Sequence, residues 1–211
     1  MGVVGRQFGS PSGLLGRLAG RFMARNNAAF NRRLVDEVAS LVPPARVVAE
    51  LGFGPGVGLA ALLSAFPDAL VLGADPSPAL AGQAAGRNRA AIEAGRLRLV
   101  QGDAVALNAY RPIDLVVAVH VLYFWSDPVK ALEAIRHLLR PGGHVALGYH
   151  LERHMPAVAR RDFVAEGHRL YEEDEDVAAL LPPAGLKAEH HRVFGPVDGP
   201  LGRLLIASSV S

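Results

Sequence analysis

A glycine-rich segment directly after a short apolar run constrains this chain most. Residues Glu50–Gly58 read ELGFGPGVG and follow the apolar residues Val47–Ala49. Glycine lacks a Cβ and tolerates positive φ, so three alternating glycines let the backbone turn sharply and approach a ligand closely. A helix beginning near Val57 would point its N-terminal N–H groups at whatever lies above the loop. An acid two residues before such a loop, at the end of a buried strand, predicts a site for a nucleotide-sized ligand.

From Arg46 onward, apolar strand-like runs alternate with helical patterns, which is typical of a largely parallel sheet covered by helices. No helical pattern separates the last two runs, so we expect them to form an antiparallel hairpin. The sequence therefore predicts a Rossmann-like, three-layer α/β/α fold with a doubly wound seven-stranded sheet and an antiparallel last strand. The expected strands are Val47–Leu51, Leu70–Ala74, Leu97–Val100, Ile113–Val119, His144–Tyr149, Leu186–Phe194 and Arg203–Ser208, and the expected helices are Val57–Ala65, Pro78–Glu93 and Pro128–Leu139.

Two acidic residues further along fit a nucleotide ligand. Asp75 ends the run Val71–Asp75, and a strand-terminal acid about twenty residues past a glycine loop can accept hydrogen bonds from two ribose hydroxyls. Asp103, in the segment QGDA, is either a second ligand residue or a helix N-cap. Dehydrogenases place an acid much as Asp75 is placed, but their fingerprint needs G-x-G-x-x-G. The last glycine of this fingerprint would fall on Val57 if the pattern began at Gly52, and on Leu59 if it began at Gly54. Neither residue is glycine, which disfavours a nicotinamide-dependent reductase.

The order of these motifs resembles that of the class I S-adenosylmethionine (SAM)-dependent methyltransferases. The pattern E-x-G-x-G-x-G at Glu50–Gly56 resembles the first motif of the family, and LVQGDA at Leu99–Ala104 resembles the third. The segment Ile113–Trp125, followed by Ser-Asp-Pro and a helix, resembles the fourth motif, and Leu139–Gly143 resembles the L-x-P-G-G turn. The resemblance is close over residues Glu37–Leu147. It points to the small-molecule type, in the broad group that includes the ubiquinone and menaquinone methyltransferases.

The resemblance implies a cofactor-binding set. In the family, the glycines approach the methionine end of SAM, and the preceding acid anchors its amino group directly or through water. The aspartate of the third motif accepts from the adenine amino group, and the next backbone N–H meets the ring. Carried over to this chain, the expected cofactor-binding residues are Glu50, Gly52, Phe53, Gly54, Gly56, Asp75, Pro76, Gly102, Asp103, Ala104 and His120.

Two helices are expected ahead of the sheet, over Gly13–Met23 and Asn26–Leu41. Apolar residues recur near helical spacing in the second, and Pro43-Pro44 ends it. We expect them to lie over the cofactor. The chain is then a single globular domain overall, in which residues 1–42 form an N-terminal helical lid and residues 43–211 form the SAM-binding methyltransferase domain.

The methyl acceptor is expected beyond the carboxyl ends of the fourth and fifth strands, because ligands of such sheets bind there. Methyl transfer from a sulfonium depends mostly on proximity and orientation. A general base is needed only for a protonated oxygen or an acidic carbon. The substrate pocket is expected to be walled by Tyr123, Trp125, His150 and His154.

His120 and His150 are the candidate catalytic residues, because histidine titrates near neutrality and suits a base. The alternative is that each is a hydrogen-bonded wall residue, and orientation is then the main contribution. His150 and His154 are spaced i, i+4, as in some metal pairs, but no third ligand is evident nearby. We therefore expect no metal.

Several acceptor classes are disfavoured. No N-P-P-Y-like tetrad follows the fourth strand, the chain has no cysteine to attack a cytosine ring, and Leu151–Gly185 is too short for a target-recognition domain. We expect methyl transfer to oxygen, nitrogen or carbon of a small molecule. One alternative is a SAM-binding protein that does not methylate, either a regulatory subunit or a cyclase on the same fold. A lower one is an RNA methyltransferase that uses the arginine-rich amino terminus, with strongly salt-dependent binding.

The charge and the cysteine content of the chain indicate the compartment and the kind of partner to expect. The net charge is only +2, and the arginines that precede Asp36 could pair loosely with the acidic run Glu172–Asp176. The absence of cysteine fits a reducing compartment. No run approaches the roughly 18 apolar residues of a membrane span. We expect a cytoplasmic monomer or homodimer with a small-molecule acceptor, without integral membrane contact and without nucleic acid as partner.

Overall fold

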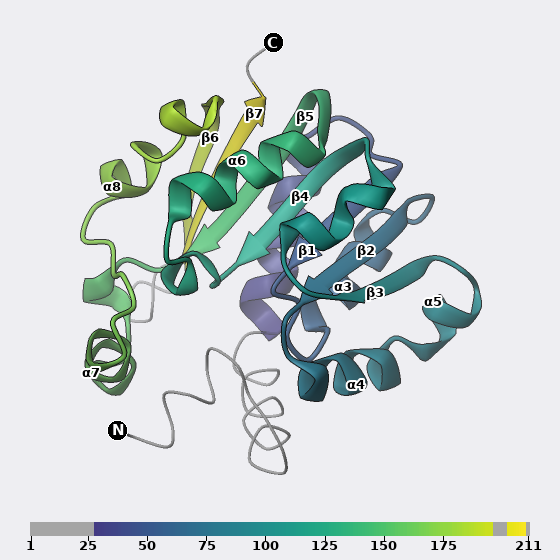
Figure 1. Cartoon of the computed structure of the whole chain (residues 1–211), viewed down its shortest axis with the longest axis horizontal. Coiled ribbons are helices and arrows are strands. Elements are labelled where there is room, and N and C mark those ends of the chain that lie inside the picture. Colours follow the sequence, from purple (N-terminus) through teal and green to yellow (C-terminus); the bar gives the residue numbers. More distant parts are fainter. Residues whose placement is uncertain (1–27, 196–201, 210–211) are drawn as a thin grey trace.

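In the computed structural model, which describes residues 28–195 and 202–209, a seven-stranded sheet forms the middle layer (Figure 1). Its spatial order is β3-β2-β1-β4-β5-β7-β6. Strands β1 to β5 pair in parallel, and β7 runs antiparallel between β5 and β6. The predicted doubly wound sheet with an antiparallel last strand is therefore confirmed. The strands are β1 (Val47–Leu51), β2 (Leu70–Asp75), β3 (Leu97–Gln101), β4 (Ile113–Val119), β5 (Leu139–Tyr149), β6 (Leu186–Phe194) and β7 (Gly202–Ser209).

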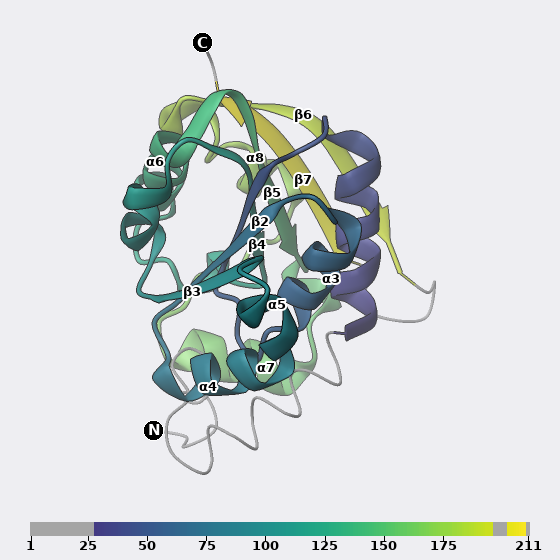
Figure 2. The same cartoon turned by 90° about the vertical axis from the view of Figure 1, so that its right-hand side faces the viewer.

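Helices cover both faces of the sheet (Figure 2). One face carries a helix over residues 28–41 together with α3, α4 and α5, and the other carries α6 and the 3-10 segment η1. A hydrophobic core lies on each face of the sheet, and β4 contributes side chains to both, because alternate side chains of a strand point to opposite faces. The labelled helices are α3 (Val57–Ala65), α4 (Pro78–Arg87), α5 (Arg89–Glu93), α6 (Pro128–Leu138), α7 (Ala157–Ala165) and α8 (Asp174–Ala178), and the 3-10 segments are η1 (Ala104–Tyr110), η2 (Leu122–Phe124), η3 (Glu152–His154) and η4 (Pro182–Ala184).

Two predicted boundaries are wrong. The single helix expected over Pro78–Glu93 is split at Asn88, which has φ −111° and ψ 25° and therefore leaves helical geometry. β5 begins at Leu139 rather than His144, because Leu139 already pairs with Ile113 of β4. The Pro-Gly-Gly turn, with Gly142 at φ 68°, forms an irregularity within the strand before His144 pairs with Leu115. Within the described residues, no helix combines the length and the apolar character that crossing a membrane requires.

The helix over residues 28–41 is part of the layer that covers the sheet. Leu34, Val35 and Val38 are buried in its core. Gly148 of β5 makes room for it, because a Cβ there would collide with the Leu34 side chain. This part of the predicted lid over residues 1–42 therefore packs on the sheet, and its first turn reaches the carboxyl ends of the strands. The predicted helix Gly13–Met23 lies outside the described residues, and the domain boundary stays a prediction.

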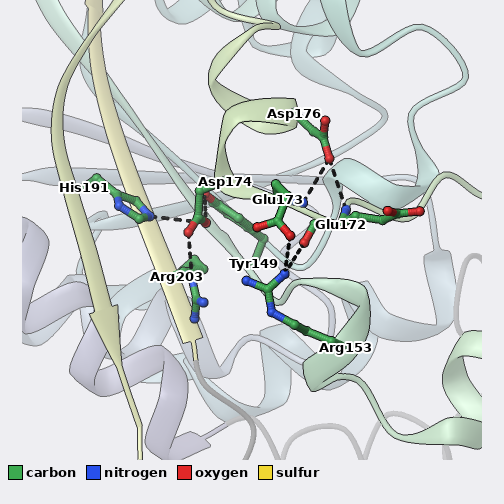
Figure 3. A network of polar contacts seen from close by, with 8 residues as sticks. All are labelled: Tyr149, Arg153, Glu172, Glu173, Asp174, Asp176, His191 and Arg203. Atoms are coloured by element: carbon green, nitrogen blue, oxygen red, sulfur yellow. Dashed lines mark hydrogen bonds and ion pairs between the residues drawn. The ribbon is translucent and has the colours of Figure 1, made fainter.

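Asp174, the first residue of α8, joins three strands of the sheet (Figure 3). Its carboxylate accepts from the Tyr149 hydroxyl at 2.9 Å and from Arg203 Nε at 3.1 Å. His191 Nε2 lies 3.3 Å from the same carboxylate. Because these partners come from β5, β7 and β6, α8 is held at the end of the antiparallel hairpin.

The ends of the segment before α8 are also fastened to each other. Glu152 N–H donates to Tyr171 O at 2.8 Å. Arg153 donates to Glu172 O at 2.6 Å and pairs with Glu173 at 2.8 Å (Figure 3). Among the described residues, the side chains that pair with the acidic run Glu172–Asp176 thus come from η3 and from β5, β6 and β7. The residues around α7 lie between these contacts.

A second carboxylate, Asp114 on β4, joins the start of β1 to β5. Its Oδ2 accepts from the backbone N–H groups of Arg46 and Val47, each at 2.9 Å, and Arg140 Nε donates to Oδ1. Partial burial alone would raise the pKa of Asp114, but the Val47 N–H and the Arg140 guanidinium hold it below its ordinary value. The ionised form therefore stabilises the fold.

We expect Asp114→Asn to lower the free energy of unfolding by about 2 kcal/mol, because an amide cannot accept from all three donors. The pKa of Asp114 is depressed in the folded state. Its contribution is thus present above the unfolded pKa and lost as the pH falls through the folded pKa. The deficit of the variant should shrink in thermal melts taken from about pH 7 down to about pH 3.

The exposed Asp68→Asn is the matched control and should melt like the wild type. An equal loss in both variants, or a deficit that does not change with pH, would contradict the role of Asp114.

Candidate functional site

The glycine loop between β1 and α3 has a backbone that only glycine adopts readily. Gly52, Gly54 and Gly56 have φ values of 67°, 52° and 79°. Space is also limited at two of these positions. A Cβ on Gly52 would collide with the Val121 side chain after β4, and a Cβ on Gly56 would collide with Ala84 of α4. The loop is therefore packed closely against both of its neighbours.

Glu50 lies at the carboxyl end of β1 and is 3% exposed. Its Oε2 is buried and has no hydrogen-bond partner among the described residues. A Cβ on Gly58 in α3 would overlap the carboxylate. Burial, and then the neighbouring Asp75 charge, raise the pKa of Glu50 well above its ordinary value. An unpaired buried carboxylate is costly, so this position suits a cationic partner.

Asp75, at the end of β2, holds the glycine loop from one side. Its Oδ2 accepts from Gly54 N–H and its Oδ1 accepts from Ser77 N–H, both at 2.8 Å. Burial raises the pKa of Asp75, although these two backbone hydrogen bonds lower it in part. A carboxylate has about four lone-pair sites. Asp75 can therefore anchor the loop and still accept from ribose hydroxyls.

Helix α4 holds the loop from the other side. Asn88 Nδ2 donates to the carbonyl oxygens of Gly56 and Ala84, each at 3.0 Å, and Arg87 Nε donates to Pro55 O at 3.0 Å. Sequence reasoning missed Asn88 and Arg87. The available signal was an asparagine inside an expected helix, where its short polar side chain competes for backbone groups.

A cavity of about 600 Å³ lies over this loop. All of the predicted cofactor-binding residues except Gly56 line it, together with Trp125 from the expected substrate pocket. The lining also includes residues that were not expected there. These come from the helix over residues 28–41, from η1, from η2 and from α6, and they include Asn31, Val105, Phe124, Lys130, Ala131, Ala134 and Ile135.

At one end of the cavity, Asp103 caps η1. Its Oδ1 accepts from Val105 N–H at 3.0 Å. The N-cap alternative is therefore realised, and the same residue lines the cavity. Its contact with an adenine amino group stays a prediction. The neighbouring Val105 side chain is exposed and lines the same end.

At the other end, His120 follows β4 in a left-handed conformation, with φ 56°. Its N–H donates to Gly148 O at 2.8 Å, and its ring stacks on His150 with a centroid distance of 4.7 Å. Phe30 packs on His120 at 4.5 Å. Burial, and then the His150 ring, lower the pKa of His120 to about 3. The imidazole is therefore neutral near pH 7 and a weak base.

The structure places Tyr123, His150 and His154 outside the lining of the cavity. The Tyr123 hydroxyl accepts from His150 N–H at 2.6 Å and donates to His150 O at 3.0 Å. The Tyr123 hydroxyl is thus bonded to the backbone that follows β5 and does not face the cavity. His154 lies on η3, away from the cavity lining. Of the four residues expected to wall the substrate pocket, one, Trp125, lines the cavity. Among the described residues, no group of three or more possible ligands could hold a metal ion.

Comparisons with known proteins agree on one kind of domain. Residues 49–145 match a family described as "Methyltransferase domain". The trans-aconitate 2-methyltransferase of Methylobacterium radiotolerans is 36% identical over 102 residues, which cover 48% of this chain and 37% of that protein. The uncharacterized methyltransferase YdaC of Bacillus subtilis is 28% identical over 131 residues, which cover 62% of this chain and 69% of that protein. The first of these matches thus spans well under half of the relative.

A solved structure shows the same fold. The O-methyltransferase NcsB1 from neocarzinostatin biosynthesis, in complex with S-adenosyl-L-homocysteine (SAH) and 1,4-dihydroxy-2-naphthoic acid, superposes with a TM-score of 0.71. It is 19% identical, and the superposition covers 93% of this chain and 58% of that one. At this identity the likeness concerns the fold alone.

We expect Asn88→Ala to loosen the glycine loop and to lower the free energy of unfolding by about 1–3 kcal/mol, because two buried side-chain hydrogen bonds are lost. Gly56 O and Ala84 O would keep only their backbone donors, Ala60 N–H and the N–H of residue 88. Hydrogen exchange should accelerate at the backbone amides of residues 52–58. The exposed Asn108→Ala serves as control and should change neither quantity. Unchanged exchange in the loop of Asn88→Ala would show that α4 does not hold it.

Proposed function

We propose that this chain is a class I SAM-dependent methyltransferase that transfers a methyl group from SAM to a small-molecule acceptor, which the match of residues 49–145 to a family described as "Methyltransferase domain" supports. The observation that carries the proposal is the buried, unpaired Glu50 carboxylate on a cavity formed over three glycines with positive φ. A related protein is named for trans-aconitate and another for malonyl-[acyl-carrier protein], which supports a small or carrier-bound acceptor with oxygen as the attacking atom.

The charge of the cavity supports a cationic ligand. Its described lining contains the carboxylates of Glu50, Asp75, Asp103 and Asp127, and Lys130 is the cation among them. Lys130 is itself paired with Asp127 at 3.3 Å. SAM carries a sulfonium, which activates the methyl group for displacement, and an ammonium. Both positive charges are favoured where carboxylates outnumber cations.

The residues that would hold SAM follow from this arrangement. Glu50 accepts from the ammonium, and the glycine loop lies under the methionine portion. Asp75 accepts from the ribose hydroxyls. Asp103 and the backbone of Ala104 meet the adenine. The small and apolar side chains of α6 suit the flat face of the ring.

We propose that His120 orients the reactants and does not remove a proton. Its ring is buried against Phe30 and His150, and its pKa of about 3 makes it a poor proton acceptor near neutrality. His150 lies outside the cavity lining, which disfavours direct contact with the acceptor. We place this activity in the cytoplasm, in a monomer or homodimer, on the sequence grounds given above.

The pH dependence of SAH binding tests the site. Burial and the Asp75 charge raise the pKa of Glu50 in the free protein, and an ammonium beside the carboxylate would lower it, so that binding is coupled to proton release. Affinity should therefore rise with pH until Glu50 is ionised in the free protein. Calorimetry in buffers of different ionisation enthalpy should detect the released proton. Glu50→Gln should weaken SAH binding about tenfold or more and abolish the release.

The exposed Glu93→Gln is the control and should bind SAH like the wild type, with the same proton release. A wild-type protein that does not bind SAH would refute the proposed function. Binding without any proton release would refute the role of Glu50 alone.

Methyl transfer itself is tested by incubating the protein with SAM and metabolite pools and searching by mass spectrometry for the gain of one methyl group. Once an acceptor is found, His120→Ala should lower turnover by less than about tenfold, whereas loss of a general base costs about 10²–10⁴-fold. The turnover of the wild type, measured against pH, should show no inflection from a titrating histidine between about pH 6 and pH 9. A loss of the larger size, with a changed pH profile, would establish His120 as the base. SAH binding without transfer to any acceptor would favour the non-methylating alternative.

A further inference from the structure

Asn31 presents an unsatisfied polar atom to the cavity. It lies in the first turn of the helix over residues 28–41, lines the cavity and is 8% exposed. Its Oδ1 is buried and has no hydrogen-bond partner among the described residues. Buried amide oxygens are nearly always hydrogen-bonded in folded proteins. This atom is therefore positioned for a ligand.

The neighbours of Asn31 place it at one end of the cavity. The preceding residue, Phe30, packs on His120 at 4.5 Å and on Phe194 at 5.3 Å. His120 directly precedes Val121, the side chain that fills the space beside Gly52. The first turn of this helix therefore lies near the junction of β4 and the glycine loop. Asp103 and α6 line another part of the same cavity, where the adenine is expected.

Two polar groups that line the cavity are hydrogen-bond acceptors without a donor in the described part of the chain. Glu50 Oε2 and Asn31 Oδ1 are both buried acceptors without partners, and both line the same cavity. They come from two separate elements, β1 and the helix over residues 28–41. A ligand group that satisfies two such acceptors needs more than one N–H, as an ammonium has. An asparagine amide also carries donors, so it can serve the carboxylate of the same amino acid.

We propose that Asn31 binds the amino acid end of SAM together with Glu50, from a helix outside the methyltransferase motifs. The inference rests on the proposed function and adds a cofactor contact that precedes the matched residues 49–145. It also gives the helix over residues 28–41 a direct role in cofactor binding, beyond covering the sheet.

Two ligands separate this role from a structural one. SAH carries the amino acid group, whereas 5′-methylthioadenosine has the same adenosine and thioether but lacks that group. Calorimetry should show that Asn31→Ala weakens SAH binding about tenfold and leaves 5′-methylthioadenosine binding within about twofold. Asn31→Leu, which fills the space without an amide, should do the same. The exposed Asn108→Ala should bind both ligands like the wild type.

A double-mutant cycle adds a second readout. Because Asn31 and Glu50 would contact the same ammonium, the losses of SAH affinity in Asn31→Ala and Glu50→Gln should not be additive. Fully additive losses would contradict a shared ligand group.

Three results would overturn the proposal. An equal loss of affinity for SAH and 5′-methylthioadenosine would show that Asn31 only supports the fold. Unchanged SAH affinity, with a raised KM for the methyl acceptor, would place the amide on the acceptor side. A wild-type protein that binds neither ligand would refute the proposed function itself, which is a distinct outcome.

Discussion

The close packing of the glycine loop is the constraint on which the site depends. The backbone at Gly52 touches the Val121 side chain, and the backbone at Gly56 touches α4. Asp75 and Asn88 then fix the loop through its own N–H and C=O groups. Because both sides of the loop are occupied by protein, its open direction is the cavity. The position of the loop follows from β1, β2, β4 and α4 together.

The same packing encloses Glu50. Gly58 leaves just enough room for the carboxylate, and no described donor reaches its Oε2. The fold thus keeps an acid in a place where it is destabilising without a ligand. Such cost at a binding site is common, because a group that is already satisfied by the protein gains little from a ligand. The neutral His120 ring and the Asn31 amide complete this end of the cavity without adding a cation.

Local patterns predicted most of the fold and many of the residues that line the cavity, because apolar runs, glycine spacing and strand-terminal acids are properties of neighbouring residues. Contacts between distant segments were not predictable in this way. Asn88 bonds to the glycine loop and Asn31 lines the same cavity, both from segments well removed in sequence, and neither belongs to a motif. Tyr123 was expected in the pocket, but η2 directs its hydroxyl to the His150 backbone. Asn88 also breaks the helix that periodicity predicted as continuous.

The segment between β5 and β6 is closed on itself at its base. Glu152 bonds to Tyr171, and Asp174 joins the following helix to three strands. Between these two fastened ends, the segment is attached to the domain by the buried Phe163, which packs on Tyr123 and Phe124, and by the Arg169 N–H, which donates to Tyr123 O. Substitutions on the exposed side of α7, where Val158 and Val164 lie, should accumulate more freely than at Phe163, since exposed positions tolerate them best. Sequence divergence would then concentrate on the exposed side of α7, while Phe163, the glycine loop and the supports of the loop stay unchanged.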